Sequence, residues 1–193
     1  MLYKGQNMII SIINKKGGVG KTSFGFSIAK DLELYLQSND ASIIESIYPN
    51  MSKISAQPKL IDNCVYDFGG FVSAGVLDIA TKSNFIIVPC TALYNSILRT
   101  SETINELKEV NKNIIVLITD YTSDEDKEQV ESALKSSFKN LKYFYFKRSK
   151  ILENSMRLGG SFKELGEASP LLKVAYRNFL GEYDRLLKTL KSI

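Results

Sequence analysis

The sequence predicts an α/β fold with a doubly wound, mainly parallel sheet that carries helices on both faces. Short apolar runs alternate with segments of helical periodicity along most of the 193 residues, which is typical of βα units. Several runs are almost continuously apolar, as strands that are buried on both faces require. A glycine-rich segment joins the first apolar run to the first helical one. Together the three features indicate one sheet built from βα units.

In the first half of the chain, the expected elements follow one another closely. Residues 8–13 are nearly all apolar and predict the first strand, and residues 22–37 carry apolar side chains at helical spacing, which predicts its crossover helix. Apolar runs predict further strands at 41–47 and 64–68, and a helix is expected at 73–81.

The second half continues the alternation. Strands are expected at 85–89, 114–119 and 141–146, and helices at 95–110, 124–138 and 170–190. The middle one of these strands should be central and the last one should lie at an edge. Ser123 or Asp124 is the expected cap of the second of these helices, whose first turn is acidic. Ser169 is the expected cap of the last helix, with Pro170 at its first position and an apolar stripe that packs on the sheet.

Length and composition predict a single domain over residues 1–193. No apolar stretch approaches the roughly 20 residues that span a bilayer, and residues 1–7 contain no signal-peptide core, so we expect a cytoplasmic protein without a membrane partner. The chain has no histidine, which excludes histidine-based catalysis and most zinc chemistry. Cys64 and Cys90 lie far apart in apolar runs and are expected to be buried thiols.

The glycine-rich segment between the first strand and the first helix predicts a phosphate-binding loop. It consists of Lys15, Lys16, Gly17, Gly18, Val19, Gly20, Lys21, Thr22 and Ser23. The glycines let the backbone bend around a phosphate, and the helix presents its free N–H groups to the same anion. Lys21 can reach the β- and γ-phosphates, and the Thr22 hydroxyl can bind Mg²⁺. The segment departs from the general pattern G-x-x-x-x-G-K-[ST] at Lys15, where the pattern has glycine.

Asp67 is the candidate acid on the magnesium side of this site. It lies near the end of the expected strand at 64–68 and is followed by Gly69 and Gly70. A carboxylate at that strand end lies beside the phosphate loop in doubly wound folds, where it can hold a Mg²⁺-bound water. The glycines allow the next backbone segment to approach the γ-phosphate. The alternative is an aspartate that only caps a turn.

Lys16, directly before Gly17 and Gly18, makes the loop read K-G-G-V-G-K-T. This resembles the deviant phosphate loop of the ParA/MinD family of P-loop ATPases, especially the small, ParF-like plasmid-partition branch. The resemblance implies a P-loop NTPase fold, ATP and Mg²⁺ as cofactors, and a homodimer that sandwiches two nucleotides. It implies catalytic roles for Lys21 and for Lys16, which would reach the ATP of the partner subunit; the alternative for Lys16 is a solvated loop lysine. The implied nucleotide contacts are residues 16–23, Asp67, Gly69 and Asp120, and the implied magnesium contacts are Thr22, Asp67 and Glu45.

The second nucleotide motif of that family departs most from this sequence. In the family, the second strand ends in a D-x-D-P-Q type motif whose aspartate before proline positions the attacking water. The expected strand at 41–47 offers Glu45 but no aspartate before Pro49. We therefore expect Mg²⁺–ATP binding with slow or absent hydrolysis. Two roles stay open for Glu45, a place in the Mg²⁺ shell or a cap on the strand end.

Asp120 follows the expected strand at 114–119, where family members often contact adenine. It either accepts a hydrogen bond from the base or caps the next helix.

The region from residue 139 to residue 163 is basic, with seven lysine or arginine residues against one acid. It resembles the loop and short helix with which small partition ATPases bind DNA without sequence preference. Candidate DNA-binding residues are Lys147, Arg148, Lys150 and Arg157. The alternative is a solvated charged face.

These features favour a ParA-like ATP-binding switch in plasmid or DNA partition, with DNA and a partition or DNA-transfer protein as partners. One alternative is a hydrolysis-deficient, nucleotide-dependent interaction protein, such as an accessory of DNA transfer. Another is a small-molecule enzyme of the dethiobiotin synthetase type.

Overall fold

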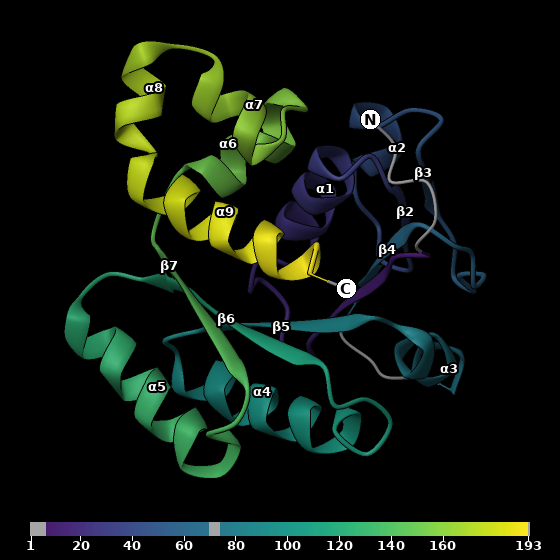
Figure 1. The fold of residues 1–193 in the computed structure, drawn as a ribbon, viewed down its shortest axis with the longest axis vertical. Coiled ribbons are helices and arrows are strands. Elements are labelled where there is room, and N and C mark those ends of the chain that lie inside the picture. Colours follow the sequence, from purple (N-terminus) through teal and green to yellow (C-terminus); the bar gives the residue numbers. More distant parts are fainter. Residues whose placement is uncertain (1–6, 70–73, 193) are drawn as a thin grey trace.

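A parallel seven-stranded sheet forms the centre of the computed structural model, which describes residues 7–69 and 74–192 (Figure 1). The strands are β1 (Ile9–Ile13), β2 (Tyr35–Ser38), β3 (Ser52–Ile54), β4 (Cys64–Phe68), β5 (Phe85–Thr91), β6 (Ile114–Tyr121) and β7 (Lys142–Lys147). Their order is β3-β2-β4-β1-β5-β6-β7, and every neighbouring pair is parallel. The predicted doubly wound α/β fold is confirmed.

Helices cover both faces of this sheet. They are α1 (Lys21–Asp31), α2 (Ile44–Ile47), α3 (Ala74–Lys82), α4 (Tyr94–Leu107), α5 (Asp124–Phe138), α6 (Ile151–Leu158), α7 (Phe162–Glu167), α8 (Pro170–Ala175) and α9 (Arg177–Leu190). In Figure 1, α3, α4 and α5 lie on one side of the sheet, and α1, α6, α7 and α9 lie on the other. The two buried apolar clusters follow this division. None of the helices in the described ranges is long and apolar enough to cross a bilayer.

Aromatic side chains hold the α1, α7 and α9 layer against the sheet. Phe24 of α1 lies edge-to-face with Phe146 of β7 and Phe162 of α7, with ring centroids 4.8 and 5.3 Å apart. Phe179 of α9 completes this cluster, 4.9 Å from Phe146. Such edge-to-face contacts are favourable because the positive edge of one ring meets the negative face of another. The layer therefore fixes α1, and with it the loop that precedes α1.

The second strand is not where the sequence predicts it, and this correction changes the candidate site. The expected helix at 22–37 ends at Asp31, and the expected strand at 41–47 is a loop followed by the short helix α2. Glu33 adopts a left-handed φ of 56°, which stops the helix, and β2 begins two residues later. The residues of β2 pair with both β3 and β4. The carboxyl end of the second strand is therefore Ser38.

Other elements differ less from expectation. The strand expected at 114–119 is β6, which lies second from the edge of the sheet; β1 occupies the middle, so the expected central place of β6 is wrong. The expected edge place of β7 is confirmed. Ser123 caps α5 and Ser169 caps α8, as predicted. The expected single helix at 170–190 is divided at Tyr176 into α8 and α9. The apolar stripe of its longer part, α9, is buried.

A buried acid joins α1 to the C-terminal helices and provides a stability test. The Asp31 carboxylate accepts hydrogen bonds from Ser161 Oγ at 2.5 Å and from Tyr183 Oη at 2.9 Å. Burial raises the pKa of Asp31, and both hydrogen bonds oppose that rise. Tyr183 itself is fully buried.

We expect Tyr183→Phe to lower the free energy of unfolding by about 1–2 kcal/mol, because it removes one of the two hydrogen bonds to a largely buried carboxylate. Urea denaturation followed by circular dichroism measures the change. Tyr94→Phe is the matched control, since the Tyr94 side chain is exposed and the substitution removes the same hydroxyl. Equal unfolding free energies for the two variants would show that the Asp31 contact does not stabilise the fold.

Candidate functional site

The loop between β1 and α1 has the backbone geometry of a cradle for phosphate. Gly18 and Gly20 have left-handed φ values of 74° and 94°, which side chains with a Cβ rarely adopt. A Cβ at Gly17 or Gly18 would meet no neighbouring atom within 4 Å, so both face open space. The loop lines a cavity of about 420 Å³ together with Lys21, Thr22 and Ser23 at the start of α1.

Buried polar side chains from three other strands and helices hold this loop in place. The Asn14 side-chain amide donates to the Pro89 carbonyl at 2.6 Å and to Thr100 Oγ1 at 2.7 Å, and its oxygen accepts from the Lys16 N–H at 2.8 Å. The Thr119 hydroxyl donates to the Val19 carbonyl at 3.2 Å. Nothing in the local sequence pattern singles out Asn14 or Thr119. Their bonds to Pro89, Thr100 and Val19 span at least 75 positions along the chain, so only the fold reveals them.

Lys21 and Thr22 line the cavity, and the buried Asp67 carboxylate lies behind them, hydrogen-bonded to the Thr22 hydroxyl and close to the Lys21 charge. Lys21 is only 7% exposed, and its Nζ donates to the Lys16 carbonyl at 3.1 Å. Burial lowers the pKa of Lys21, while the nearby Asp67 and Asp40 carboxylates act in the opposite direction. A buried ammonium that makes one hydrogen bond still has two N–H donors for a phosphate in the cavity.

Asp67 is almost completely buried, at 1% exposure. Its Oδ2 accepts hydrogen bonds from Thr22 Oγ1 at 2.8 Å and Ser38 Oγ at 3.2 Å. Its Oδ1 is buried and has no hydrogen-bond partner among the residues that the structure describes. Burial raises the pKa of Asp67, and the Thr22 hydrogen bond and the Lys21 charge oppose that rise. The expected alternative, a turn-capping aspartate, does not describe this arrangement.

Asp40 is the acid that sequence reasoning missed. In the sheet register, Ser38 of β2 lies opposite Asp67 of β4, so Asn39 and Asp40 emerge at the same edge as the phosphate loop. Asp40 is exposed and lines the cavity. The Asn39 side chain accepts from the Gly69 N–H at 2.6 Å, and a Cβ on Gly69 would lie 2.9 Å from the Asp40 Cβ. The backbone at Gly69 therefore approaches Asp40 closely because it lacks a side chain.

Glu45, expected in the magnesium shell or as a strand cap, has neither place. It lies on α2, where it is exposed, accepts a hydrogen bond from the Ile54 N–H at 3.0 Å and pairs with Lys53 at 3.3 Å. It does not line the cavity. The expectation failed because residues 41–47 are not the second strand. The conclusion that no aspartate follows the second strand is wrong for the same reason, since Asp40 does. Gly70 lies outside the described residues.

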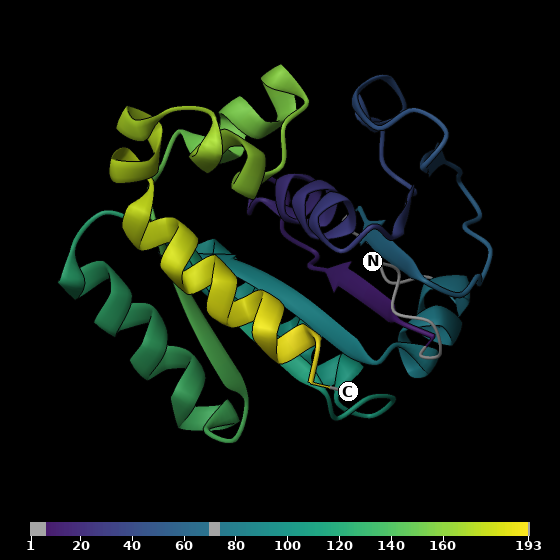
Figure 2. The same ribbon diagram turned by 45° about the horizontal axis from the view of Figure 1, so that its top comes forward.

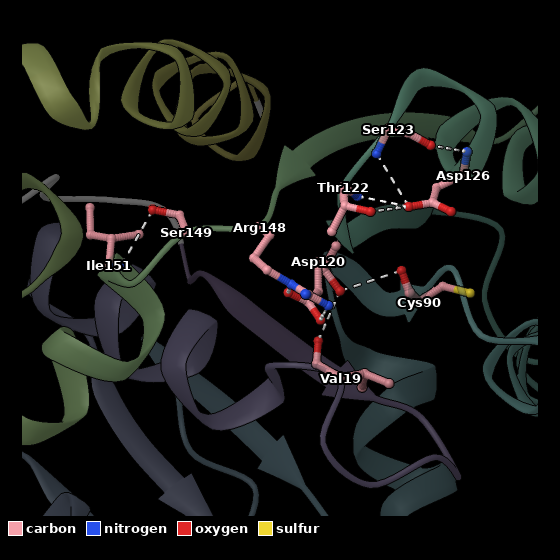
Figure 3. Close-up of polar contacts among 10 residues, drawn as sticks. Val19, Cys90, Asp120, Thr122, Ser123, Asp126, Arg148, Ser149 and Ile151 are labelled. Atoms are coloured by element: carbon pink, nitrogen blue, oxygen red, sulfur yellow. Dashed lines mark hydrogen bonds and ion pairs between the residues drawn. The ribbon is translucent and has the colours of Figure 1, made fainter.

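Asp120 sits at a β-bulge of β6 and has a left-handed φ of 56°. Such bulges re-aim side chains and are common next to functional sites. The Asp120 carboxylate accepts two hydrogen bonds from the Arg148 guanidinium, at 2.8 and 3.1 Å (Figure 3). The residue lines the cavity, so it lies where a nucleotide base could be contacted. It does not cap α5, because Ser123 and Asp126 form that cap together.

The lysines around the loop have different surroundings. The Lys15 side chain forms a salt bridge with Glu106 of α4. Lys16 is partly exposed, and its Nζ donates only to the Gly17 carbonyl, at 3.2 Å; none of the described carboxylates pairs with it. Lys16 is therefore a cation without a carboxylate partner among the described residues, directly before the loop residues that line the cavity.

The four candidate DNA-binding residues have different surroundings. Lys147 lines the cavity, and Arg148 is held by Asp120. Lys150 is exposed immediately before α6, while Arg157, on α6, donates to the Asn154 side chain at 3.0 Å. The basic stretch is thus distributed over β7 and α6.

Large apolar side chains are exposed beside the cavity. Leu93 and Tyr94, at the start of α4, are 65% and 77% exposed, and they follow Thr91, which lines the cavity. Exposed apolar side chains next to a binding site often mark a surface that a partner covers.

Comparison with solved structures identifies the fold. A putative plasmid partition protein from Borrelia burgdorferi bound to AMPPNP superposes with a TM-score of 0.65 at 16% identity, over 93% of this chain and 99% of that one. Apo McdA from Cyanothece gives 0.64 at 15% identity, over 93% and 99%, and the cell-division ATPase MinD from Pyrococcus furiosus gives 0.62 at 13%, over 94% and 100%. No protein-family model and no curated protein sequence matches the chain. At these identities the likeness shows the fold, which is the P-loop ATPase fold of ParA and MinD.

Proposed function

We propose that this protein is a nucleotide-dependent switch of the ParA/MinD type, which binds Mg²⁺–ATP at the phosphate loop and acts in plasmid or DNA partition. The observation that carries the proposal is the buried group of Lys21, Thr22 and Asp67 at the base of the loop. Structural neighbours support it, since they include a partition protein bound to AMPPNP and a Pyrococcus horikoshii MinD complexed with Mg-ADP.

The residues at the base of the cavity fit a magnesium ion accompanied by phosphates. Mg²⁺ prefers oxygen ligands and is commonly held by one or two protein groups plus substrate phosphates. Thr22 offers a hydroxyl there, and Asp67 offers a buried carboxylate oxygen without a partner among the described residues. When bound, the ion neutralises charge on the β- and γ-phosphates. Ser38 and Thr22 orient the Asp67 carboxylate for this role.

Asp40 changes the expectation about hydrolysis. A carboxylate that follows the second strand is the residue type that positions water in the resembling family, and Asp40 lies at that strand end, in the cavity wall. An aspartate-to-alanine variant of Cyanothece McdA is among the structural neighbours, in complex with ATP. We therefore propose that the protein hydrolyses ATP and that Asp40 orients the attacking water.

A homodimer formed on ATP binding is the second part of the proposal. Lys16 is a cation without a carboxylate partner in the described parts of the chain, and it directly precedes the loop residues that line the cavity. The nucleotide of a second subunit would supply the missing anion there. Leu93 and Tyr94 form an exposed apolar surface at the same edge.

A neighbouring structure is the MinC:MinD complex of Aquifex aeolicus, which supports a partner protein as well. Non-specific DNA remains a proposed partner through Lys150 and Arg157, which are exposed.

Light scattering coupled to gel filtration tests the dimer. With Mg²⁺ and a non-hydrolysable ATP analogue, we expect the 21.7 kDa chain to elute as a dimer. Tyr94→Glu should stay monomeric because it places a charge in the centre of the covered surface, and Lys16→Ala should stay monomeric because it removes the cation that reaches across. Leu171→Glu, at an equally exposed apolar residue on α8, is the control and should dimerise. A wild-type monomer under all conditions contradicts the sandwich dimer.

A further inference from the structure

A second cavity lies beside the first, at the carboxyl ends of β6 and β7. It has a volume of about 430 Å³ and lies between the start of α5 and the start of α9, two helices that flank β7 (Figure 2). Its wall includes Tyr121, Lys127, Tyr145, Lys147, Arg148 and Arg185. Open α/β sheets bind ligands outside the carboxyl ends of their strands, which is where this cavity lies.

Four cations from three separate segments line this cavity. Two of these four cations form ion pairs within the protein. Arg148 is held by the Asp120 carboxylate, and Arg185 pairs with Glu182. Glu182 also accepts a hydrogen bond from the Tyr145 N–H at 2.9 Å, so this acid is occupied twice.

The remaining two cations, Lys127 and Lys147, form no salt bridge with any carboxylate in the described ranges. The Lys127 ammonium lies over the Tyr145 ring, 4.6 Å from its centroid, and Lys147 is exposed. A cation–π contact of this kind holds an ammonium in place without neutralising its charge. The Glu131 carboxylate, which pairs with Lys135, also attracts Lys127 without forming a salt bridge with it. The cavity therefore carries a net positive charge of up to about two in a concave space that also contains aromatic surface.

We propose that this cavity binds a small phosphate monoester. A phosphate monoester carries a charge of about −1.5 to −2 at neutral pH, which matches the two free ammonium groups, whereas a carboxylate would neutralise only one. The volume lies in the range of small-molecule sites, and Tyr121 and Phe179 supply apolar surface for the organic part of the ligand. The two lysines share one concavity rather than following an extended stripe, which favours a small dianion over a nucleic-acid backbone.

No residue of the phosphate loop lines the second cavity. The phosphate-monoester site proposed there therefore does not depend on the function proposed for the phosphate loop. Lys147 and Ser149 line both cavities. The ion pair of Asp120 and Arg148 (Figure 3) connects the two cavities, because Asp120 lines the first and Arg148 lines the second. The bulge at Asp120 aims its carboxylate at Arg148 and so fixes this ion pair.

Titration of ¹⁵N-labelled protein with phenyl phosphate tests the proposal, with phenyl sulfate as the monoanionic ligand control. The titrations are made in the Lys21→Ala variant, in which the phosphate loop has lost its buried ammonium. We expect saturable shifts of the Tyr121, Tyr145 and Ser149 amide signals with phenyl phosphate and weaker binding of phenyl sulfate. Adding Lys127→Ala or Lys147→Ala should weaken phenyl phosphate binding about tenfold, because each removes one of the two free ammonium groups. Lys139→Ala and Lys142→Ala are matched controls, because both residues are exposed cations of the α5 and β7 segments outside the cavity.

The outcomes separate the proposal from its competitors. Thermal unfolding first establishes that each variant is folded. Shifts confined to the phosphate loop, equal losses in the control variants, or absence of shifts up to about 10 mM phenyl phosphate would each overturn the proposal. Binding of a single-stranded oligonucleotide, but not of phenyl phosphate, with the same sensitivity to Lys127→Ala would also overturn it and would assign the cavity to nucleic acid.

Discussion

Lys21→Ala is expected to weaken ATP binding by at least about 100-fold, below detection at micromolar protein concentration. Lys21 is the buried cation of the phosphate loop. Among the described residues its Nζ has only the Lys16 carbonyl as a hydrogen-bond acceptor, so its other donors can bind phosphate oxygens. Each hydrogen bond between a charged donor and a charged acceptor contributes more than a neutral one. Removal of the ammonium also leaves Asp67 as a buried carboxylate without its nearest cation, which opposes the approach of further negative charge.

Isothermal titration calorimetry with Mg²⁺ and a non-hydrolysable ATP analogue measures the effect. Lys15→Ala is the matched control, because Lys15 belongs to the same loop but is paired with Glu106, and its affinity should stay within about threefold of wild type. Lys21→Met keeps most of the side-chain stem and guards against a variant that fails to fold. If Lys21→Met and Lys15→Ala bind the nucleotide equally well, the loop does not hold the phosphates in the proposed way.

The phosphate loop could be predicted because its chemistry lies in consecutive residues. A glycine-rich segment between an apolar run and a helical one contains the loop backbone, Lys21 and Thr22 in fixed order, and the fold has only to supply the strand and the helix on either side. Asp67 was predictable for a related reason. Its strand is apolar throughout, its end is marked by Gly69, and the β4–β1 pairing that brings it to the loop is the usual one for this fold.

The position of the second strand could not be predicted from local pattern. Residues 22–37 keep a helical spacing of apolar side chains, and Gln37 and Ser38 are polar residues in a strand that is buried. Gln37 is compatible with burial only because its side chain bonds to the main chain of Lys59, a tertiary contact. With β2 misplaced, nothing singled out Asp40. The sequence Ser38-Asn39-Asp40, directly after Gln37, is the signal that places a hydroxyl and an acid at a strand end.

The second cavity illustrates a different limit. Lys127, Lys147 and Arg185 stand on α5, β7 and α9, and no spacing in the sequence relates them. The basic stretch from 139 to 163 drew attention to Lys147 and Arg148, but it grouped them with Lys150 and Arg157, which line neither cavity. Basic residues that are neighbours in the sequence do not share one surface here, because successive side chains of a strand or a helix point in different directions.

Asp40→Ala is expected to lower the rate of ATP hydrolysis by at least about 100-fold while leaving ATP affinity nearly unchanged. The carboxylate lies in the cavity wall at the end of β2, exposed to water and close to Lys21 and Asp67, but it takes no part in the hydrogen bonds that hold the loop or the Asp67 carboxylate. Its loss should therefore affect the orientation of water and not the binding of phosphates. The ATP-bound dimer should accumulate in this variant, because ATP hydrolysis, which would let the dimer dissociate, is slowed.

Phosphate release under single-turnover conditions measures the rate, and calorimetry measures the affinity. Glu45→Ala is the control that separates the two acids, since Glu45 is bound to Lys53 and the Ile54 N–H outside the cavity and should not affect the rate. Gly69→Ala gives an independent check, because its Cβ would lie 2.9 Å from the Asp40 Cβ and displace that residue without altering its charge. If Asp40→Ala hydrolyses ATP as fast as wild type, water is oriented by another group. If wild type binds ATP but releases no phosphate, Asp40 has no hydrolytic role, and the protein is a nucleotide-dependent interaction protein whose dimer persists as long as ATP is bound.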